Sequence, residues 1–490
     1  MARLLGRLVL GLGAITGVAI LATGGFLVWG VQRVRSYEQL DDPAALSRKA
    51  IELARMTAAA TAAHAERPNV VLILFDDLGY GDIGAFGGRA LETPRIDALA
   101  AEGIALDHYY AAASVCTPSR AGLLTGRWPI RTGLSYAVFP TGHALDSAMR
   151  MAGRNIRLPA DEITLAEALR AAGYATALVG KWHLGDHSPS LPRDLGFDRF
   201  MGLLYSNDMS PLPLWSNEEI IEPDPVDQTK LTPRYTRAAI NFIEASQDRP
   251  FFLYLAHSFP HIPLHSTPQQ AGQSRAGLYG DVIADLDESV GAILDTLDRL
   301  QLSERTLVIV TSDNGPWFQG SPGGVRGRKA GTFEGGMRVP FIARWPGRIA
   351  AGERSDAIVA GIDVFPTALL LAGVPLPEDR LIDGIDIMPA LTGSGALPER
   401  PIFYYDVEDL QAVRVGRFKW QDRRGIAYGR IPGVPLAPRL PRGPWLFDLL
   451  RDPDESYDVS GLHKDEMLRL EALARAHEAE IATDARGWRR

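Results

Sequence analysis

The sequence predicts an α/β fold: a large, mainly parallel sheet sandwiched by helices, followed by a small C-terminal antiparallel sheet plus a helix. Continuous apolar runs rich in Val, Ile and Leu recur along the chain, as in strands that are buried on both faces. Stretches with helical periodicity separate these runs, and this alternation is typical of parallel sheets covered by helices. A group of short strand-like runs after residue 400 predicts the smaller sheet.

The predicted strands of the large sheet begin at Asn69. They are NVVLILF (69–75), ATALVG (175–180), FFLYLA (251–256) and TLVIVTS (306–312). Helical patterns such as ITLAEALRAAGY and GDVIADLDESVGAILDTLDRLQL lie between them. The runs RPIFYYD, LQAVRVGRFKWQ and PWLFDLLRD predict the small sheet, and a helix is expected from about Lys464 to Thr483. We therefore expect a main α/β domain over 69–400 and a C-terminal subdomain over 401–490.

Composition is that of an ordinary folded globular protein, with 490 residues, a formal net charge of -8 and 46% hydrophobic residues. The chain has no basic run and no internal repeat, so nothing suggests a nucleic-acid partner. The single cysteine, Cys116, excludes an intrachain disulfide framework and a thiolate zinc site. Composition alone would place this cysteine in the core as a small apolar residue.

The N-terminal segment predicts a membrane anchor over 1–38. Its residues 8–31 carry no charge and lie between Arg7 and Arg33. As a helix they would span about 36 Å, enough to cross a hydrocarbon core of about 30 Å. The alternative is a cleaved signal peptide, whose apolar core is usually shorter. Arginines at both ends leave the orientation open, and 39–68 is expected to be a helical or flexible linker.

Polar residues directly follow four of the predicted strands. Ligands of open α/β sheets bind beyond the carboxyl ends of the strands, so these residues are expected at one edge. They are Asp76 and Asp77, Lys181 and His183, His257 and His261, and Asp313 and Asn314. Three carboxylates and an amide form a set of hard oxygen ligands that suits Ca²⁺ or Mg²⁺. The aspartates would repel one another without a cation between them, so the sequence predicts a metal site at this edge.

Cys116 lies in the string SVCTPSRAGLLTGRWP, where Pro118 fits the first turn of a helix and Gly126 fits its end. The start of a helix offers free backbone N–H groups and the positive end of the dipole, which favour an anion. Arg120, about one turn further on, adds a positive charge to the same place. This setting favours a site residue over a buried structural cysteine.

The string CTPSRAGLLTG resembles the signature of the sulfatase family, in which Cys, Pro and Arg direct an enzyme to oxidise the cysteine to formylglycine. The resemblance extends from Asn69 to the C-terminus through LFDDLGYGD, GKWHLG, SDNG, TFEGGMRVP and DGIDIMPALTG, in the family's order. The strings GRWPIRTGL, LPADEITLAEAL and GLLYSND make it most similar to the arylsulfatase A group. It implies a formylglycine-dependent sulfuric ester hydrolase of the alkaline phosphatase superfamily.

The same resemblance assigns expected roles to individual residues. The implied ligands of Ca²⁺, or of Mg²⁺ in its place, are Asp76, Asp77, Cys116, Asp313 and Asn314. The implied catalytic residues are Cys116, Arg120, Lys181, His183, His261 and Lys329. The implied substrate-binding residues are Lys181, Ser206, His261 and Lys329. The string HIP identifies His261 in the family pattern, whereas His257 and His265 match no family position and are expected to be structural.

The mechanism that the resemblance implies uses a hydrated formylglycine derived from Cys116. One of its hydroxyls attacks sulfur and displaces the alcohol. His183 is the expected base for the second hydroxyl, after which the carbon expels sulfate and the aldehyde is restored. Either His261 or Lys329 would protonate the leaving oxygen, and the sequence leaves this choice open.

Two other functions fit the same sequence. A phosphodiesterase or phosphonate monoester hydrolase of the same superfamily would share the formylglycine motif. A non-catalytic, membrane-anchored anion-binding relative would have lost metal or nucleophile residues, and here all these positions are filled. The expected partners are a small-molecule or sugar sulfate ester, a formylglycine-generating enzyme, and a membrane through the N-terminal helix. The catalytic domain is expected in the periplasm or outside the cell.

Overall fold

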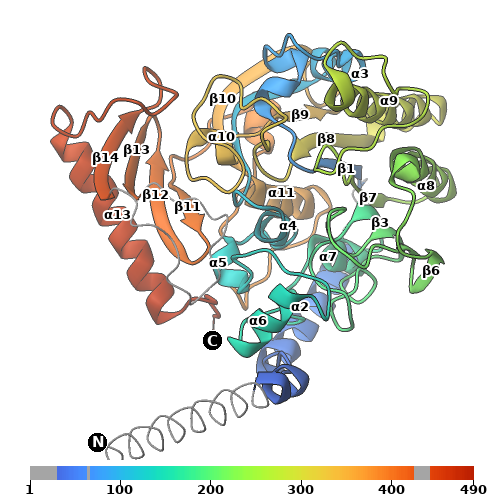
Figure 1. Cartoon of the computed structure of the whole chain (residues 1–490), viewed down its shortest axis with the longest axis horizontal. Helices are drawn as coiled ribbons and strands as arrows, with labels where there is room; N and C mark the ends of the chain where they lie inside the picture. The colour runs from blue at the N-terminus through green and yellow to red at the C-terminus, as the bar shows by residue number, and fades with distance from the viewer. Residues whose placement is uncertain (1–29, 63–66, 424–441, 490) are drawn as a thin grey trace, which may run out of the picture.

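A ten-stranded sheet forms the centre of the computed structural model, which describes residues 30–62, 67–423 and 442–489 (Figure 1). The strand order is β10-β2-β9-β8-β1-β7-β3-β4-β5-β6. The five strands from β8 to β4 in this order are parallel, while β9, β5 and β6 pair with their neighbours antiparallel. The prediction of a mainly parallel sheet is therefore confirmed. The strands are β1 (Asn69–Phe75), β2 (Ile104–Tyr110), β3 (Ala175–Lys181), β4 (Arg199–Leu203), β5 (Leu214–Ser216), β6 (Glu219–Glu222), β7 (Phe251–Ala256), β8 (Thr306–Ser312), β9 (Phe341–Arg344) and β10 (Glu353–Ala360).

Helices cover both faces of this sheet because successive side chains of a strand point to opposite sides. In β1, Val70 and Leu72 belong to a core shared with α2, α4, α7 and α11. Val71 and Ile73 belong to a second core shared with α3, α8 and α9. The helices are α2 (Pro43–Ala62), α3 (Pro94–Ala101), α4 (Cys116–Thr125), α5 (Pro129–Thr132), α6 (Ala144–Met151), α7 (Leu165–Ala171), α8 (Leu231–Ser246), α9 (Gly277–Arg299), α10 (Glu334–Met337), α11 (Val364–Leu371) and α12 (Met388–Leu391).

A second, four-stranded antiparallel sheet lies beside the large sheet, drawn in orange and red in Figure 1. Its order is β11-β12-β13-β14, and α13 packs on it through Met467 and Leu470. Met337 of α10 shares the same core, which joins the two parts of the molecule. These elements are β11 (Ile402–Asp406), β12 (Asp409–Val415), β13 (Phe418–Arg423), β14 (Arg442–Asp448) and α13 (Lys464–Thr483), as the sequence predicts.

The segment expected to be a linker is instead largely a part of the folded domain. Helix α2 packs against α7, where Lys49 Nζ lies 2.6 Å from Glu167 Oε1, and Met56 is fully buried in the main core. Just before α2, the Gln39 amide donates to the carbonyl of Arg157 at 3.1 Å. Because of these buried contacts, α2 is part of the folded domain and does not act as a flexible spacer.

The predicted membrane helix, residues 8–31, lies almost wholly outside the described residues. Residues 30–36 form a helical turn, and Arg33 Nε donates to the carbonyl of Met151 at 3.2 Å. Among the residues that the structure describes, no helix has the length and apolar character needed to cross a membrane.

The C-terminal tail returns to the main domain at Trp488. The guanidinium carbons of four arginines lie 4.7–5.6 Å from the centre of this ring, at distances typical of cation–π contacts. They come from separate parts of the chain and are Arg48, Arg127, Arg380 and Arg486. Trp488 therefore connects α2, the loop after α4 and the C-terminal tail.

Candidate active site

The register between β1 and β8 brings the predicted acidic residues together. Phe75 pairs with Ser312 at the carboxyl ends of these strands, so Asp76–Asp77 and Asp313–Asn314 follow side by side. The backbone N–H of Asp77 donates to Asp313 Oδ1 at 3.2 Å, and Asn314 Nδ2 donates to Asp77 Oδ1 at 2.7 Å. Asp77 has a φ of 70°, which is costly for a residue with a side chain and is typical of functional sites.

Cys116 is the first residue of α4 and is 4% exposed. Its thiol donates to Asp76 Oδ1 at 3.2 Å, and Lys329 Nζ donates to its sulfur at 3.4 Å. Burial, with the charges of Asp313 and Asp76, raises the pKa of this thiol well above its usual value. The unmodified side chain is thus a neutral thiol, which is a poor nucleophile.

Three buried cations face the three carboxylates. Arg120, on α4, donates through Nε to Asp313 Oδ2 at 2.9 Å. Lys181, the last residue of β3, donates to Asp76 Oδ2 at 2.6 Å and to Ser206 Oγ at 3.1 Å. The third cation is Lys329, whose Nζ lies 2.8 Å from Asp77 Oδ1. The expected site residues come from six separate segments of the chain and therefore meet at one place.

The charges in this cluster perturb one another strongly. Burial alone would raise the pKa of Asp76, but Lys181, His261 and Arg120 outweigh it and hold this pKa well below the usual range. Burial and the nearby Asp76 raise the pKa of Asp313 to about 6. Neighbouring carboxylates oppose each other's ionisation when they are buried together. A bound cation would favour the ionised form of both and so stabilise this arrangement.

The residues present fit a hard divalent cation. Ligand atoms of Asp76, Asp77, Cys116 and His261 lie within 4.8 Å of one another. Among the described residues, the buried Oδ1 of Asn314 has no hydrogen-bond partner, although such acceptors are nearly always satisfied. An oxygen-rich set with an unsatisfied amide oxygen suits Ca²⁺ or Mg²⁺. In this geometry His261 joins the group, whereas Asp313 is paired with Arg120.

His261 is oriented by Asn207, a residue for which the sequence suggested no role. His261 Nδ1 lies 3.1 Å from Asn207 Oδ1 and 2.5 Å from the carbonyl of Ile262. Both atoms are acceptors, so Nδ1 carries the proton and donates. The other nitrogen, Nε2, then faces Asp77 Oδ2 at 3.8 Å. Asn207 follows Ser206 directly in the string YSND, which was its only available signal.

His183 lies at the edge of the cluster and contacts it less directly. Its Nε2 lies 3.0 Å from the carbonyl of Val138, so Nε2 is the protonated nitrogen. Burial, with the charge of Lys181, holds its pKa well below the usual value, so the ring is neutral. Nδ1 is buried without a hydrogen-bond partner among the described residues and can accept a proton. Like Asp77, His183 has a positive φ, 61°.

The two histidines that match no family position lie outside this cluster. His257 is fully buried, stacks on Phe75 and contacts Ser289 Oγ at 3.2 Å. Burial lowers its pKa to about 3, so it is neutral. His265 packs against Phe259. Both contacts are those of structural histidines.

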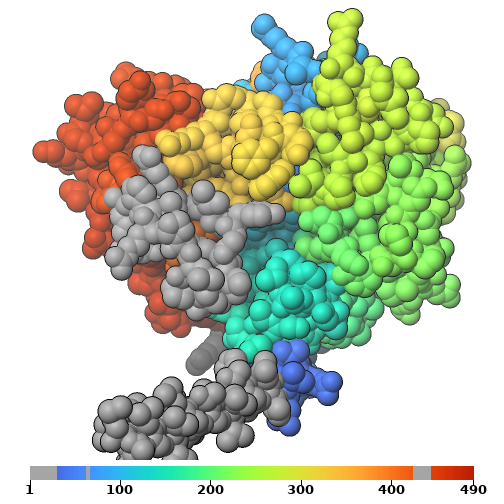
Figure 2. Space-filling model, viewed as in Figure 1, coloured from blue at the N-terminus to red at the C-terminus, as the bar shows by residue number. Residues whose placement is uncertain are grey.

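The loops after β4 and before α10, which carry Ser206 and Lys329, come to one face of the molecule together with the region around α6. In Figure 2 the region around α6 (teal), the region between β4 and α8 (green) and the region before α10 (yellow) border one another.

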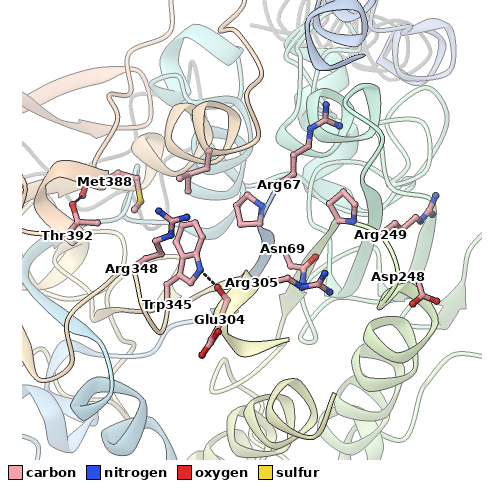
Figure 3. Close-up of a pocket in the computed structure, with 13 residues that line it drawn as sticks. Arg67, Asn69, Asp248, Arg249, Glu304, Arg305, Trp345, Arg348, Met388 and Thr392 are labelled. Carbon is pink, nitrogen blue, oxygen red and sulfur yellow. Dashed lines mark hydrogen bonds between the residues drawn. The ribbon is translucent and has the colours of Figure 1, made fainter. Parts of the chain in front are cut away.

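A separate pocket of about 480 Å³ lies at the opposite edge of the sheet, where β1, β7 and β8 begin (Figure 3). Asn69, Pro250 and Arg305 line it, and Trp345 donates there to the carbonyl of Glu304. None of the predicted catalytic or metal-binding residues lines that pocket.

Comparison with known proteins agrees with this geometry. The family model Sulfatase matches residues 68–374, and the model N-sulphoglucosamine sulphohydrolase, C-terminal, matches 328–473. The chain is 39% identical to canine (Canis lupus familiaris) N-acetylgalactosamine-6-sulfatase over 80% of this chain and 82% of that protein. It is 38% identical to human (Homo sapiens) arylsulfatase A over 82% of this chain and 85% of that protein.

A solved structure gives the same result. The PsFucS1 sulfatase from Pseudoalteromonas sp. superposes with a TM-score of 0.75 at 29% identity, covering 90% of this chain and 95% of that one. The similarity to arylsulfatase A predicted from the sequence is confirmed, and N-acetylgalactosamine-6-sulfatase matches equally well. The chain belongs to the sulfatase family and is a sulfuric ester hydrolase.

Proposed function

We propose that this sulfatase hydrolyses sulfate monoesters of sugars with a formylglycine formed from Cys116. The observation that carries the proposal is the position of Cys116 Sγ at the start of α4, 3.2 Å from Asp76 and 3.4 Å from Lys329. A neutral, buried thiol would be a poor nucleophile and a poor metal ligand at this position. As formylglycine hydrate, the residue would supply two hydroxyls on one carbon, one to displace the alcohol from sulfur and one to release sulfate.

The carboxylates beside Cys116 would hold a divalent cation, Ca²⁺ in our proposal. Its ligands would be Asp76, Asp77, Asp313, Asn314 and the modified Cys116. When bound, the cation would supply positive charge to the sulfate oxygens and favour a deprotonated nucleophile. Arg120, held by Asp313 and the carbonyl of Lys181, adds a fixed positive charge at the same end of α4.

Lys181 and Lys329 would bind the remaining sulfate oxygens, with Ser206 fixing the position of Lys181 Nζ. Both ammonium groups are already held by carboxylates, so they are oriented before the substrate arrives, which favours the transition state. His183 would accept a proton at its free Nδ1. Two groups lie where they could protonate the leaving oxygen: Lys329 Nζ carries its proton already, whereas His261 Nε2 would first have to take one up, because the proton of the neutral ring is on Nδ1.

A sugar sulfate is the substrate class that the relatives favour. One relative is named for N-acetylgalactosamine 6-sulfate, and one structural neighbour is described as acting in glycosaminoglycan metabolism. These names apply to those proteins. For this chain they support a sulfated monosaccharide or oligosaccharide over a small aryl sulfate as the natural ester.

We further propose that residues 8–31 anchor the protein in a membrane, with the catalytic domain on the outer side. The support is the uncharged run in the sequence. The oxidising partner, a formylglycine-generating enzyme, would then act before or during export. A reporter fused at the C-terminus tests this orientation, and reporter activity only in the cytoplasm would contradict it.

The central test is mass spectrometry of the peptide that contains Cys116, from protein made in a host that performs the oxidation. We expect the mass of formylglycine; unmodified cysteine in inactive protein would refute the proposal. Rates on 4-nitrophenyl sulfate and on a 4-nitrophenyl phosphodiester separate the sulfatase from the phosphodiesterase alternative. A large excess for the diester would overturn the proposed substrate class.

A further inference from the structure

The segment that carries Lys329 is held from the small C-terminal sheet. This segment, 326–336, has four glycines in the string RGRKAGTFEGG and therefore little stiffness of its own. The backbone N–H of Lys329 donates to the carbonyl of Pro316 at 3.0 Å, and the N–H of Ala330 donates to that of Ser114 at 2.7 Å. Further contacts reach the segment from the C-terminal sheet and from the turn after it.

Lys419, in β13, reaches the middle of this segment. Its Nζ donates to the carbonyl of Thr332 at 2.8 Å and lies 3.9 Å from the centre of the Tyr404 ring. The side chain is 0% exposed. Thr332 is three residues from Lys329, so the catalytic ammonium and the Lys419 contact belong to the same short stretch of backbone.

Glu455 binds both ends of the segment. Its Oε2 accepts from the backbone N–H of Glu334 at 2.7 Å, and its carbonyl accepts from Arg326 at 3.1 Å. Its Oε1 lies 2.8 Å from Lys419 Nζ, which completes the connection between the two residues. Glu455 is fully buried and has a φ of 54°, a backbone conformation that a residue with a side chain adopts at a cost.

We propose that Lys419 and Glu455 are positioning residues that fix Lys329 in the active site. The proposal rests on the function proposed for Lys329. A buried ion pair is poor evidence of stabilisation, because removing two charges from water costs nearly as much as their attraction returns. What this pair does provide is a fixed geometry for a glycine-rich segment, and a displacement of about 1 Å at a reacting group costs up to 100-fold in rate.

The test compares Lys419→Met with Lys49→Met. Lys49 is a matched control, since it too is a buried lysine paired with a glutamate, Glu167 at 2.6 Å, and with a backbone carbonyl, that of Ala160 at 2.7 Å. We expect Lys419→Met to lower kcat about 10- to 100-fold on 4-nitrophenyl sulfate. We expect Lys49→Met to change kcat less than about 2-fold, both measured on protein shown to be folded by circular dichroism.

A double-mutant cycle shows whether Lys419 acts through Lys329. Lys329→Ala alone should lower kcat about 10²- to 10³-fold, as expected for loss of one charge at the transition state. Adding Lys419→Met should then cause no further loss, because the group that it positions is absent. A full multiplicative loss in the Lys329→Ala background, or a Lys419→Met variant that behaves like Lys49→Met, would overturn the proposal.

The catalytic role proposed for Lys329 and the positioning role proposed for Lys419 and Glu455 would fail in different ways. If the proposed role of Lys329 is wrong, Lys329→Ala retains its activity, whatever Lys419→Met does. If only the positioning role is wrong, Lys329→Ala is impaired while Lys419→Met is not. Should Lys419→Met fail to fold, Glu455→Gln replaces it, since an amide oxygen still accepts from the N–H of Glu334 while the ion pair is lost. The same kcat loss and the same cycle are then expected, and their absence counts against the proposal.

Discussion

Asn207 offers a sharp test of how the site is oriented. Its Oδ1 accepts from His261 Nδ1, while its Nδ2 donates to the carbonyl of Pro263 at 3.0 Å and to Gln228 Oε1 at 3.0 Å. Carbonyl oxygens only accept, so the amide orientation is fixed by this network. Asn207→Leu keeps the approximate volume and removes these bonds at once.

The expected magnitude follows from the bonds that are lost. Each is worth about 1 kcal/mol net, so the free energy of unfolding should fall by about 2–4 kcal/mol. Loss of an outer partner of a site histidine typically costs about 10- to 100-fold in activity. His261 Nδ1 keeps the carbonyl of Ile262 at 2.5 Å, so we expect a loss in kcat/KM nearer to about 10-fold.

The matched control is Gln228→Leu, which removes the other side of the same network without contacting His261. Gln228 Nε2 donates to the carbonyl of Asn207 at 2.9 Å, so this variant should also lose stability. Its kcat/KM on 4-nitrophenyl sulfate should stay within about 2-fold of the wild type, because His261 keeps its partner. Equal losses of kcat/KM in the two variants, or an unchanged value for Asn207→Leu, would refute the orientation argument.

Four further predictions follow from other parts of the structure. Cys116→Ser retains an oxygen nucleophile but has only one hydroxyl, so it should release at most one 4-nitrophenolate per molecule; sustained turnover would contradict the mechanism. Removal of divalent cations, verified by elemental analysis, should abolish activity and lower the melting temperature, and Ca²⁺ should restore both; full activity without metal would exclude the proposed site. Trp488→Ala loses four cation–π contacts and a partly buried ring, so chemical denaturation should show a free energy of unfolding lower by about 2–3 kcal/mol, while kcat stays unchanged. An unchanged free energy of unfolding would show that the ring contributes nothing to stability. Burial raises the pKa of Glu455 to about 7 from an ordinary value of 4.5, so between these pH values the folded protein binds a proton that the unfolded chain does not, and the free energy of unfolding should fall as pH rises from about 4.5 to 7. Glu455→Gln should remove this fall in stability, and a fall equal to that of the wild type would show that another group causes it.

The sequence predicted the central strands correctly for a physical reason. Strands such as β1 and β8 are buried along their whole length, and two-sided burial requires an unbroken apolar run. Edge strands lack this constraint. Strands β6 and β10 are largely exposed or half-buried and carry mixed sequences, so no run of apolar residues marked them.

The active site was predictable only where a residue is tied to a strand end or to a motif. Asp76 and Asp313 directly follow apolar runs, and Cys116 lies in a recognisable string, so their proximity could be inferred. Asn207 and Lys419 act from loops or from the other sheet, at positions set by tertiary packing. Helix α2 was mistaken for a spacer because its alanine-rich sequence has few large apolar residues, yet small side chains allow close packing on α7.

The order of strands in the large sheet has a consequence for biosynthesis. Two of the side chains that surround Cys116 are those of Asp313, directly after β8, and Lys329. Both residues are translated about 200 residues after the cysteine. At about 5–20 residues per second, the ribosome needs about 10–40 s to make that stretch. During this interval the chain that would enclose the thiol does not yet exist. The enzyme proposed to oxidise Cys116 would therefore have a period of access that is set by the translation rate. If the proposal holds, slowing or speeding the synthesis of 117–312 should change the fraction of molecules that leave the ribosome with an aldehyde.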